Sequence, residues 1–176
     1  MYERLKELGL KEILGYAIDS EEKAHNFYLD LAKNANVNEL VAHRFESIGR
    51  EELIHKTILL GLHKRLFGDA HYLVPEGLPP LESSVEITTL HSLIETLELA
   101  MQNEYNAYKI YTYLFKHHHE HRKLFHSLAR REQGHYDALR FEKDLFEEEI
   151  MEDPHLRHRE ILALTRDSTA FRPLDA

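Results

Sequence analysis

An eleven-residue pattern occurs twice in this chain and constrains its fold more than any other feature. FESIGREELIH runs from Phe45 to His55 and FHSLARREQGH from Phe125 to His135, with Phe, Ser, Arg, Glu and His at the same five places. Each copy ends in Glu-x-x-His, and residues three apart project from one face of a helix. The repeat predicts two equivalent helices, each presenting one Glu and one His toward the same side.

The helix that precedes each copy is also repeated. Starting at Leu14, and again 83 residues later at Leu97, side chains at steps of three and four read Leu, Ala, Glu, Ala, Tyr, Leu. This spacing is typical of the inward face of an amphipathic helix. Glu21 and Glu104 are the charged members of these two stripes.

The repeats predict an all-α four-helix bundle with helices at about 10–34, 38–66, 87–116 and 120–150. The scarcity of Gly and Pro, 7 and 5 in 176 residues, favours the same fold class. The turns NANVN and KHHHEH are short, so the helices that each one joins run antiparallel. Between the second and third helices, about 20 residues match the long crossover with which bundles restart in parallel. We therefore expect the third helix to run in the same direction as the first.

We expect the bundle to form one domain over residues 1–150, followed by a C-terminal extension over residues 151–176. Asp153 and Pro154 suit a helix start, and they predict a short helix at about 155–166. Its leucines and isoleucine give it an apolar side, which we expect to pack on the bundle or on a partner subunit.

Six polar side chains would face the interior of such a bundle. Unpaired carboxylates are strongly disfavoured in a core. Two divalent cations would neutralise four carboxylates, and two neutral imidazoles would complete the arrangement found in di-iron and di-manganese carboxylate bundles. Oxygen and imidazole ligands without thiolate suit iron or manganese. We predict two iron ions, with manganese or a mixed pair as alternatives, and the predicted metal ligands are Glu21, Glu52, His55, Glu104, Glu132 and His135.

Several other residues could contribute to the site. Tyr28 and Tyr111 either fill the core or donate hydrogen bonds to ligating carboxylates. Glu-x-x-His also occurs at Glu22–His25, beside the inward stripe, and at Glu152–His155, across a proline; we interpret both as unrelated to the site. His25 is the first residue to reconsider if the ligand set is incomplete. The turn at His117–His121 is expected to be an exposed polar loop, with a secondary metal-loading site as the alternative.

Charge and composition exclude several functions. The net charge of −9 gives no support to nucleic-acid binding. With no Cys, the chain has neither disulfides nor a thiolate-held iron centre. The charged, helical start is unlike a signal peptide, and the apolar runs are too short to cross a membrane. We expect a cytoplasmic protein.

The segments AIDSEEKAHNFYLDLA and FESIGREELIH resemble the first two helices of the ferritin-like superfamily, most closely those of rubrerythrin-type di-iron proteins. The resemblance covers residues 10–148 and implies the six ligands above, with Glu52 and Glu132 as the bridging pair. Ala107 stands where rubrerythrins often carry an extra Glu, and their Cys-rich rubredoxin domain has no counterpart here. The six ligands are also similar to the bacterioferritin site, but Leu53 occupies the place of that family's haem-ligating Met. No haem or flavin is expected.

Three functions fit this resemblance. The first is an oxidoreductase that reduces peroxide or O2 with electrons from an external donor protein. The second is a ferroxidase or iron-storage protein, and the third is a metal-stabilised structural module without catalysis. We expect a homodimer or a larger homo-oligomer, because twofold assemblies are the commonest.

Overall fold

The computed structural model describes residues 2–34, 39–76, 78 and 90–158, and every regular element in these ranges is helical. The four predicted helices are confirmed, each within three residues of its expected ends, and a short extra helix precedes them. The elements are α1 (Tyr2–Glu7), α2 (Leu10–Ala32), α3 (Glu39–Phe67), α4 (Leu90–His117), η1 (His119–His121), α5 (Arg122–Glu152) and η2 (Pro154–His158).

Local chemistry explains where several of these helices begin and end. The Glu12 side chain accepts a hydrogen bond from the backbone N–H of Gly9 at 2.8 Å, which caps the start of α2. At the same end of this hairpin, α3 stops before Gly68, whose φ of 76° lies in the left-handed region that glycine adopts without strain. Pro154 follows α5 after one residue and prevents its continuation.

The predicted C-terminal helix is described only in its first residues. Pro154–His158 form the 3₁₀ turn η2, which contacts α4 and α5, and Leu156 packs against buried residues of the bundle. The rest of the predicted helix lies outside the described residues. Within the described ranges, no helix is both long and apolar enough to cross a membrane.

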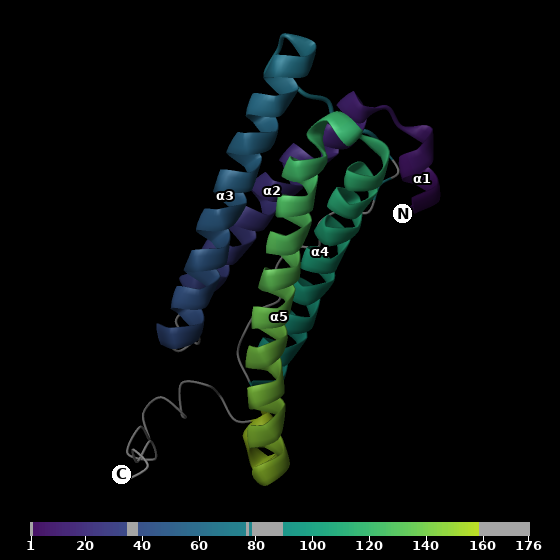
Figure 1. Cartoon of the computed structure of the whole chain (residues 1–176). Helices are drawn as coiled ribbons and strands as arrows, with labels where there is room; N and C mark the ends of the chain where they lie inside the picture. The colour runs from purple at the N-terminus through teal and green to yellow at the C-terminus, as the bar shows by residue number, and fades with distance from the viewer. Residues whose placement is uncertain (1, 35–38, 77, 79–89, 159–176) are drawn as a thin grey trace.

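The bundle consists of two helical hairpins, α2 with α3 and α4 with α5, packed side by side (Figure 1). The prediction that the first and third helices run in the same direction is wrong. Tyr28, late in α2, contacts Glu104, whereas Tyr111, later in α4, contacts Glu21. This crossed pattern is possible only if α2 and α4 are antiparallel. The parallel pairs are therefore α3 with α4 and α2 with α5.

The physical reason is the path of the crossover. Each short turn reverses the chain, and α4 begins at the end of the bundle where α3 also begins (Figure 1). The 29 residues of α3 span about 43 Å. The segment between Phe67 and Leu90 has ample length to cover that distance. Its described part lies against the first two helices, where Arg4 donates a hydrogen bond to the Glu76 carbonyl at 3.2 Å.

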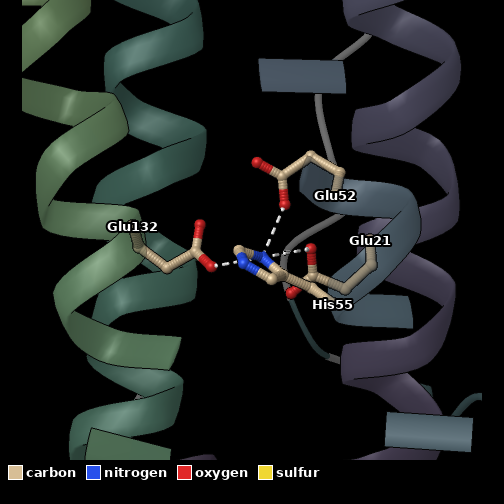
Figure 2. A group of neighbouring side chains, drawn as sticks. All are labelled: Glu21, Glu52, His55 and Glu132. Carbon is tan, nitrogen blue, oxygen red and sulfur yellow. Dashed lines mark hydrogen bonds and ion pairs between the residues drawn. The ribbon is translucent and has the colours of Figure 1, made fainter. Parts of the chain in front are cut away.

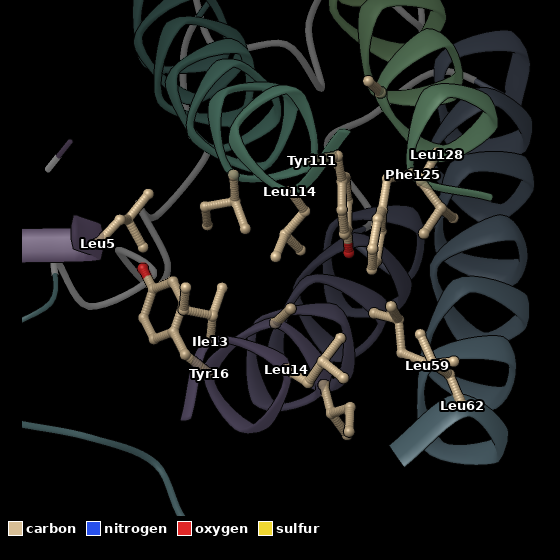
Figure 3. Packing of buried hydrophobic residues seen from close by; sticks show 14 residues of the cluster. Leu5, Ile13, Leu14, Tyr16, Leu59, Leu62, Tyr111, Leu114, Phe125 and Leu128 are labelled. Carbon is tan, nitrogen blue, oxygen red and sulfur yellow. The ribbon is translucent and has the colours of Figure 1, made fainter. Parts of the chain in front are cut away.

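The core is divided into two apolar clusters. One, at the end of the bundle that holds the α4–α5 turn, includes Leu14, Leu59, Leu114 and Phe125 (Figure 3). The other, toward the opposite end, includes Phe45 and neighbours from all four long helices. Along every helix, the positions predicted as metal ligands fall between the residues of these clusters. The polar side chains therefore occupy one layer with apolar packing on both sides.

Candidate metal centre

The structure brings all six predicted ligands together in this middle layer. Their ligand atoms form two groups, each within 4.8 Å, and all six residues are buried. Glu52 and Glu132 belong to both groups. The first group is completed by Glu21 and His55, and the second by Glu104 and His135. Each group thus takes three residues from one hairpin and one from the other, so the site forms only when the hairpins pack.

The first group surrounds the imidazole of His55, as Figure 2 shows. Its Nδ1 atom lies 2.9 Å from Glu132 Oε1 and 3.1 Å from Glu52 Oε2. Glu21 Oε2 lies farther away, at 3.7 Å. Three carboxylates from three different helices therefore converge on a single imidazole nitrogen.

The second group repeats this arrangement around His135. Its Nδ1 atom lies 2.8 Å from Glu52 Oε1, 3.3 Å from Glu104 Oε2 and 3.7 Å from Glu132 Oε2. The two imidazole rings stack with their centroids 5.8 Å apart. In both groups Nδ1 faces the carboxylates, so Nδ1 is the atom that each histidine offers to a metal ion.

Without a metal ion, protons compensate for part of the negative charge. Burial, strengthened by the charge of Glu52, raises the pKa of Glu21 to about 8. The same two causes raise the pKa of Glu104 well above its ordinary value. Burial and Glu132 act in that direction on Glu52 too, but close contacts with Glu21 and both histidines outweigh them and lower its pKa.

The histidines respond to the same surroundings. Burial would lower the pKa of His55, but close contacts with three carboxylates, Glu132 first, raise it to about 12. The pKa of His135 is raised for the same reason, with Glu104 contributing most against burial. In the metal-free core these shifts therefore favour cationic imidazoles, and they favour the neutral acid forms of Glu21 and Glu104.

Two oxygen atoms in this layer have no hydrogen bond. Glu52 Oε1 and Glu132 Oε1 are fully buried, and the imidazole nitrogens 2.8 Å and 2.9 Å away do not meet them with hydrogen-bond geometry. Both belong to the residues that the two groups share. Buried oxygens without partners, in a set of four carboxylates and two imidazoles, fit a pair of divalent cations.

The two tyrosines act on the carboxylates. The buried Tyr28 hydroxyl donates to Glu104 Oε1, and the buried Tyr111 hydroxyl donates to Glu21 Oε1. Each tyrosine thus reaches across to the other hairpin. Both tyrosines also belong to the apolar clusters, so they fill the core and hydrogen-bond the carboxylates.

The remaining candidate residues lie outside the centre. The Nδ1 atom of His25 lies 2.6 Å from the Gly49 carbonyl, so this imidazole holds the α2–α3 hairpin together. Glu22 pairs with Lys56 at 2.7 Å. Glu152 and His155 are exposed on either side of the end of α5, and the residues of the His117–His121 turn are exposed or half-buried.

One residue that contacts the centre was not predicted. Glu51 Oε2 lies 3.4 Å from Nε2 of His135, the ring nitrogen that faces away from the carboxylates, and 3.2 Å from Nη1 of Arg131. A signal for this pair exists in the repeat: Glu51 and Arg131 are equivalent positions of the two copies and carry opposite charges. A carboxylate on the far nitrogen of a ligating histidine fixes its ring orientation and tautomer.

The centre has two unlike sides. On the α3–α5 side, a hollow of about 540 Å³ reaches His135 and one of about 390 Å³ reaches His55, and Glu51 and Arg131 line both. On the α2–α4 side, a cavity of about 20 Å³ touches the four carboxylates. Histidines therefore face one side of the centre, and the other side is formed by carboxylates.

Comparison with known proteins agrees with this geometry. A hypothetical protein from Pyrococcus furiosus shares 28% identity over 82% of this chain and 94% of its own, with a TM-score of 0.71. A Thermotoga maritima protein described as ferritin-like and diiron-carboxylate has the same fold, with 21% identity over 78% of this chain and 95% of its own and a TM-score of 0.61. No curated protein matches the chain. Residues 12–143 match the family model of rubrerythrin, and the chain belongs to the rubrerythrin family.

Proposed function

We propose that this protein is a di-iron oxidoreductase that reduces hydrogen peroxide, or O2, with electrons from a separate donor protein. The observation that carries the proposal is the presence of two buried ligand groups that share Glu52 and Glu132. Membership of the rubrerythrin family supports the same class of chemistry.

Each ligand has a defined role in this proposal. Glu52 and Glu132 would bridge two iron ions, because each offers oxygens to both groups. One ion would also be held by Glu21 and His55, and the other by the equivalent pair on the second hairpin. Two ferrous ions bound in this way supply two electrons together to a small oxidant.

The protein holds the reactive layer in place. The hydroxyls of Tyr28 and Tyr111 keep the two outer carboxylates oriented, and each also ties one hairpin to the other. The apolar clusters on both sides of the layer exclude water along the bundle axis. Such a dry, rigid setting strengthens interactions with charge that develops during reaction.

The reaction needs an external supply of electrons. Hydrogen peroxide takes up two electrons and two protons, its O–O bond breaks, and two water molecules leave. The 176 residues contain no Cys that could hold an iron–thiolate centre to return the electrons. A rubredoxin-like protein or a flavoprotein would fill that role.

The test is anaerobic loading with two ferrous ions per chain, followed by rapid mixing with hydrogen peroxide. We expect one turnover that then stops, and continued turnover after a reduced rubredoxin-like or flavoprotein donor is added. The Glu95→Gln variant serves as a control and should behave like the wild type. Among the described contacts, this carboxylate pairs only with His91 on the surface of α4.

Two other results would replace the proposal. Successive ferrous additions that leave many irons per chain in a large assembly would show iron storage. Stable binding of two metal ions with no reaction toward peroxide or O2 would show a structural role.

A further inference from the structure

The small cavity on the α2–α4 side of the centre is built from equivalent positions of the two hairpins. Ser20 and Asn103 precede the outer Glu ligands, and Ala24 and Ala107 follow them by one turn. The remaining lining consists of the four carboxylates. The cavity therefore lies beside both ligand groups and away from the two histidines.

Asn103 breaks the symmetry of this lining. Its side chain is about nine-tenths buried, and its Nδ2 atom has no hydrogen-bond partner. The equivalent Ser20 differs, because its side chain is hydrogen-bonded to Tyr16. A buried amide N–H without a partner is unfavourable in a finished core. Asn103 lines a cavity, and a ligand with a lone pair bound there could accept a hydrogen bond from this N–H.

The size of the cavity restricts that ligand. Its volume of about 20 Å³ exceeds the roughly 10–15 Å³ that a single water molecule requires. The two alanines leave this space, since a larger side chain at either position would fill it. The space therefore favours a ligand of two or three heavy atoms over an alkyl-substituted peroxide.

We propose that this cavity is the binding pocket for the small oxidant, and that the Asn103 amide donates a hydrogen bond to it from Nδ2. This inference rests on the proposed function and adds a positioning residue and a size limit to it. Asn103 orients the oxidant against the carboxylate face, and Ala24 and Ala107 set the space. Organic hydroperoxides are excluded by size.

Azide tests the pocket without any turnover. It is a three-atom anion that accepts hydrogen bonds, and its binding to the oxidised, iron-loaded protein is followed by visible absorption. We expect Asn103→Ala to weaken azide binding about 10-fold or more, the effect of removing one hydrogen bond to a charged group. Ala107→Leu should abolish binding by filling the cavity. Both variants should retain the wild-type iron content.

The control is Gln102→Ala, which removes an exposed amide from the adjacent position of α4. It should leave azide affinity unchanged. Loss of the N–H itself should cost the metal-free protein no hydrogen bond, because Nδ2 has no partner there. Unchanged azide affinity in both Asn103→Ala and Ala107→Leu, or no azide binding to the wild type, would overturn the inference.

Turnover separates this inference from the proposed function. With the donor protein present, Asn103→Ala should raise the KM for hydrogen peroxide more than it lowers kcat, and tert-butyl hydroperoxide should be a poor substrate. If the wild type reduces hydrogen peroxide and the variants match it toward both peroxide and azide, the pocket assignment is refuted and the proposed function is supported. If the variants change azide affinity as expected but the wild type does not reduce peroxide, the proposed function is refuted and the small-ligand pocket is supported.

Discussion

Loading the metal-free protein with two divalent ions at neutral pH should release about four protons per chain. Glu21 and Glu104 have raised pKa values and hold protons in the metal-free core. His55 and His135 are held as cations by the surrounding carboxylates. A metal ion binds only deprotonated carboxylates and neutral imidazoles, so all four protons must leave as the two ions bind.

The proton count should depend on pH in a defined way. The pKa of Glu21 is about 8, whereas the histidine pKa values lie far higher. Above about pH 9, Glu21 is already ionised before metal binds, and the release should fall to about three protons. Anaerobic titration with Mn²⁺ avoids metal oxidation. Calorimetry in two buffers of different ionisation enthalpy then gives the proton number per bound ion.

The pH dependence of the stability of the metal-free protein provides a second test of whether Glu21 holds a proton. The folded state binds the Glu21 proton more tightly than the unfolded state does, because the pKa rises from 4.5 to about 8. The stabilisation of the folded state by this Glu21 proton is fully present below about pH 4.5, and it is lost as pH rises toward about 8. Because the pKa values of both histidines are also raised, they too lower the stability of the folded state as pH rises above about 6.5. Glu21→Gln, a neutral mimic, should therefore match wild-type stability near about pH 5 and exceed it by a few kcal/mol above about pH 8.

Release of fewer than about two protons at neutral pH would refute this reasoning, since it would mean that the metal-free carboxylates are ionised or the imidazoles neutral. A Glu21→Gln variant less stable than the wild type at every pH would refute it as well.

Three further predictions concern other parts of the structure. Glu52→Gln should lower metal content from two ions toward one per chain, measured by elemental analysis, because this residue belongs to both ligand groups; two ions retained would exclude a bridging role. Glu51→Gln should weaken metal affinity about 10–100-fold by loosening the adjacent histidine, measured by competition with a chelator, and unchanged affinity would contradict it. Gly15→Ala should destabilise the protein by about 1–3 kcal/mol in urea unfolding, because its Cβ would lie 2.2 Å from the Leu73 carbonyl oxygen. The control Gly61→Ala meets no atom within 4 Å and should stabilise α3 by up to about 1 kcal/mol; equal effects of both would contradict the contact.

The helices and the composition of the centre were readable from local sequence. Residues three and four apart share a helix face whatever the rest of the fold does, so Glu52 with His55 and Glu132 with His135 could be assigned as inward pairs. The Glu on each first helix was identifiable because a charge interrupts an apolar stripe. The repeat also predicted that the two halves of the centre would be equivalent, and the two overlapping ligand groups have that form.

Other features depended on how the hairpins pack. The length of the crossover did not reveal which helices become parallel, because the same number of residues can return along the bundle or cross it. The crossed contacts of Tyr28 and Tyr111 follow from that direction. The placement of Glu51 against His135, the unpaired Asn103 amide and the space beside Ala107 are set by distances between helices of different hairpins. Sequence spacing determines which side chains share a helix face, but only the packed structure determines what each face meets.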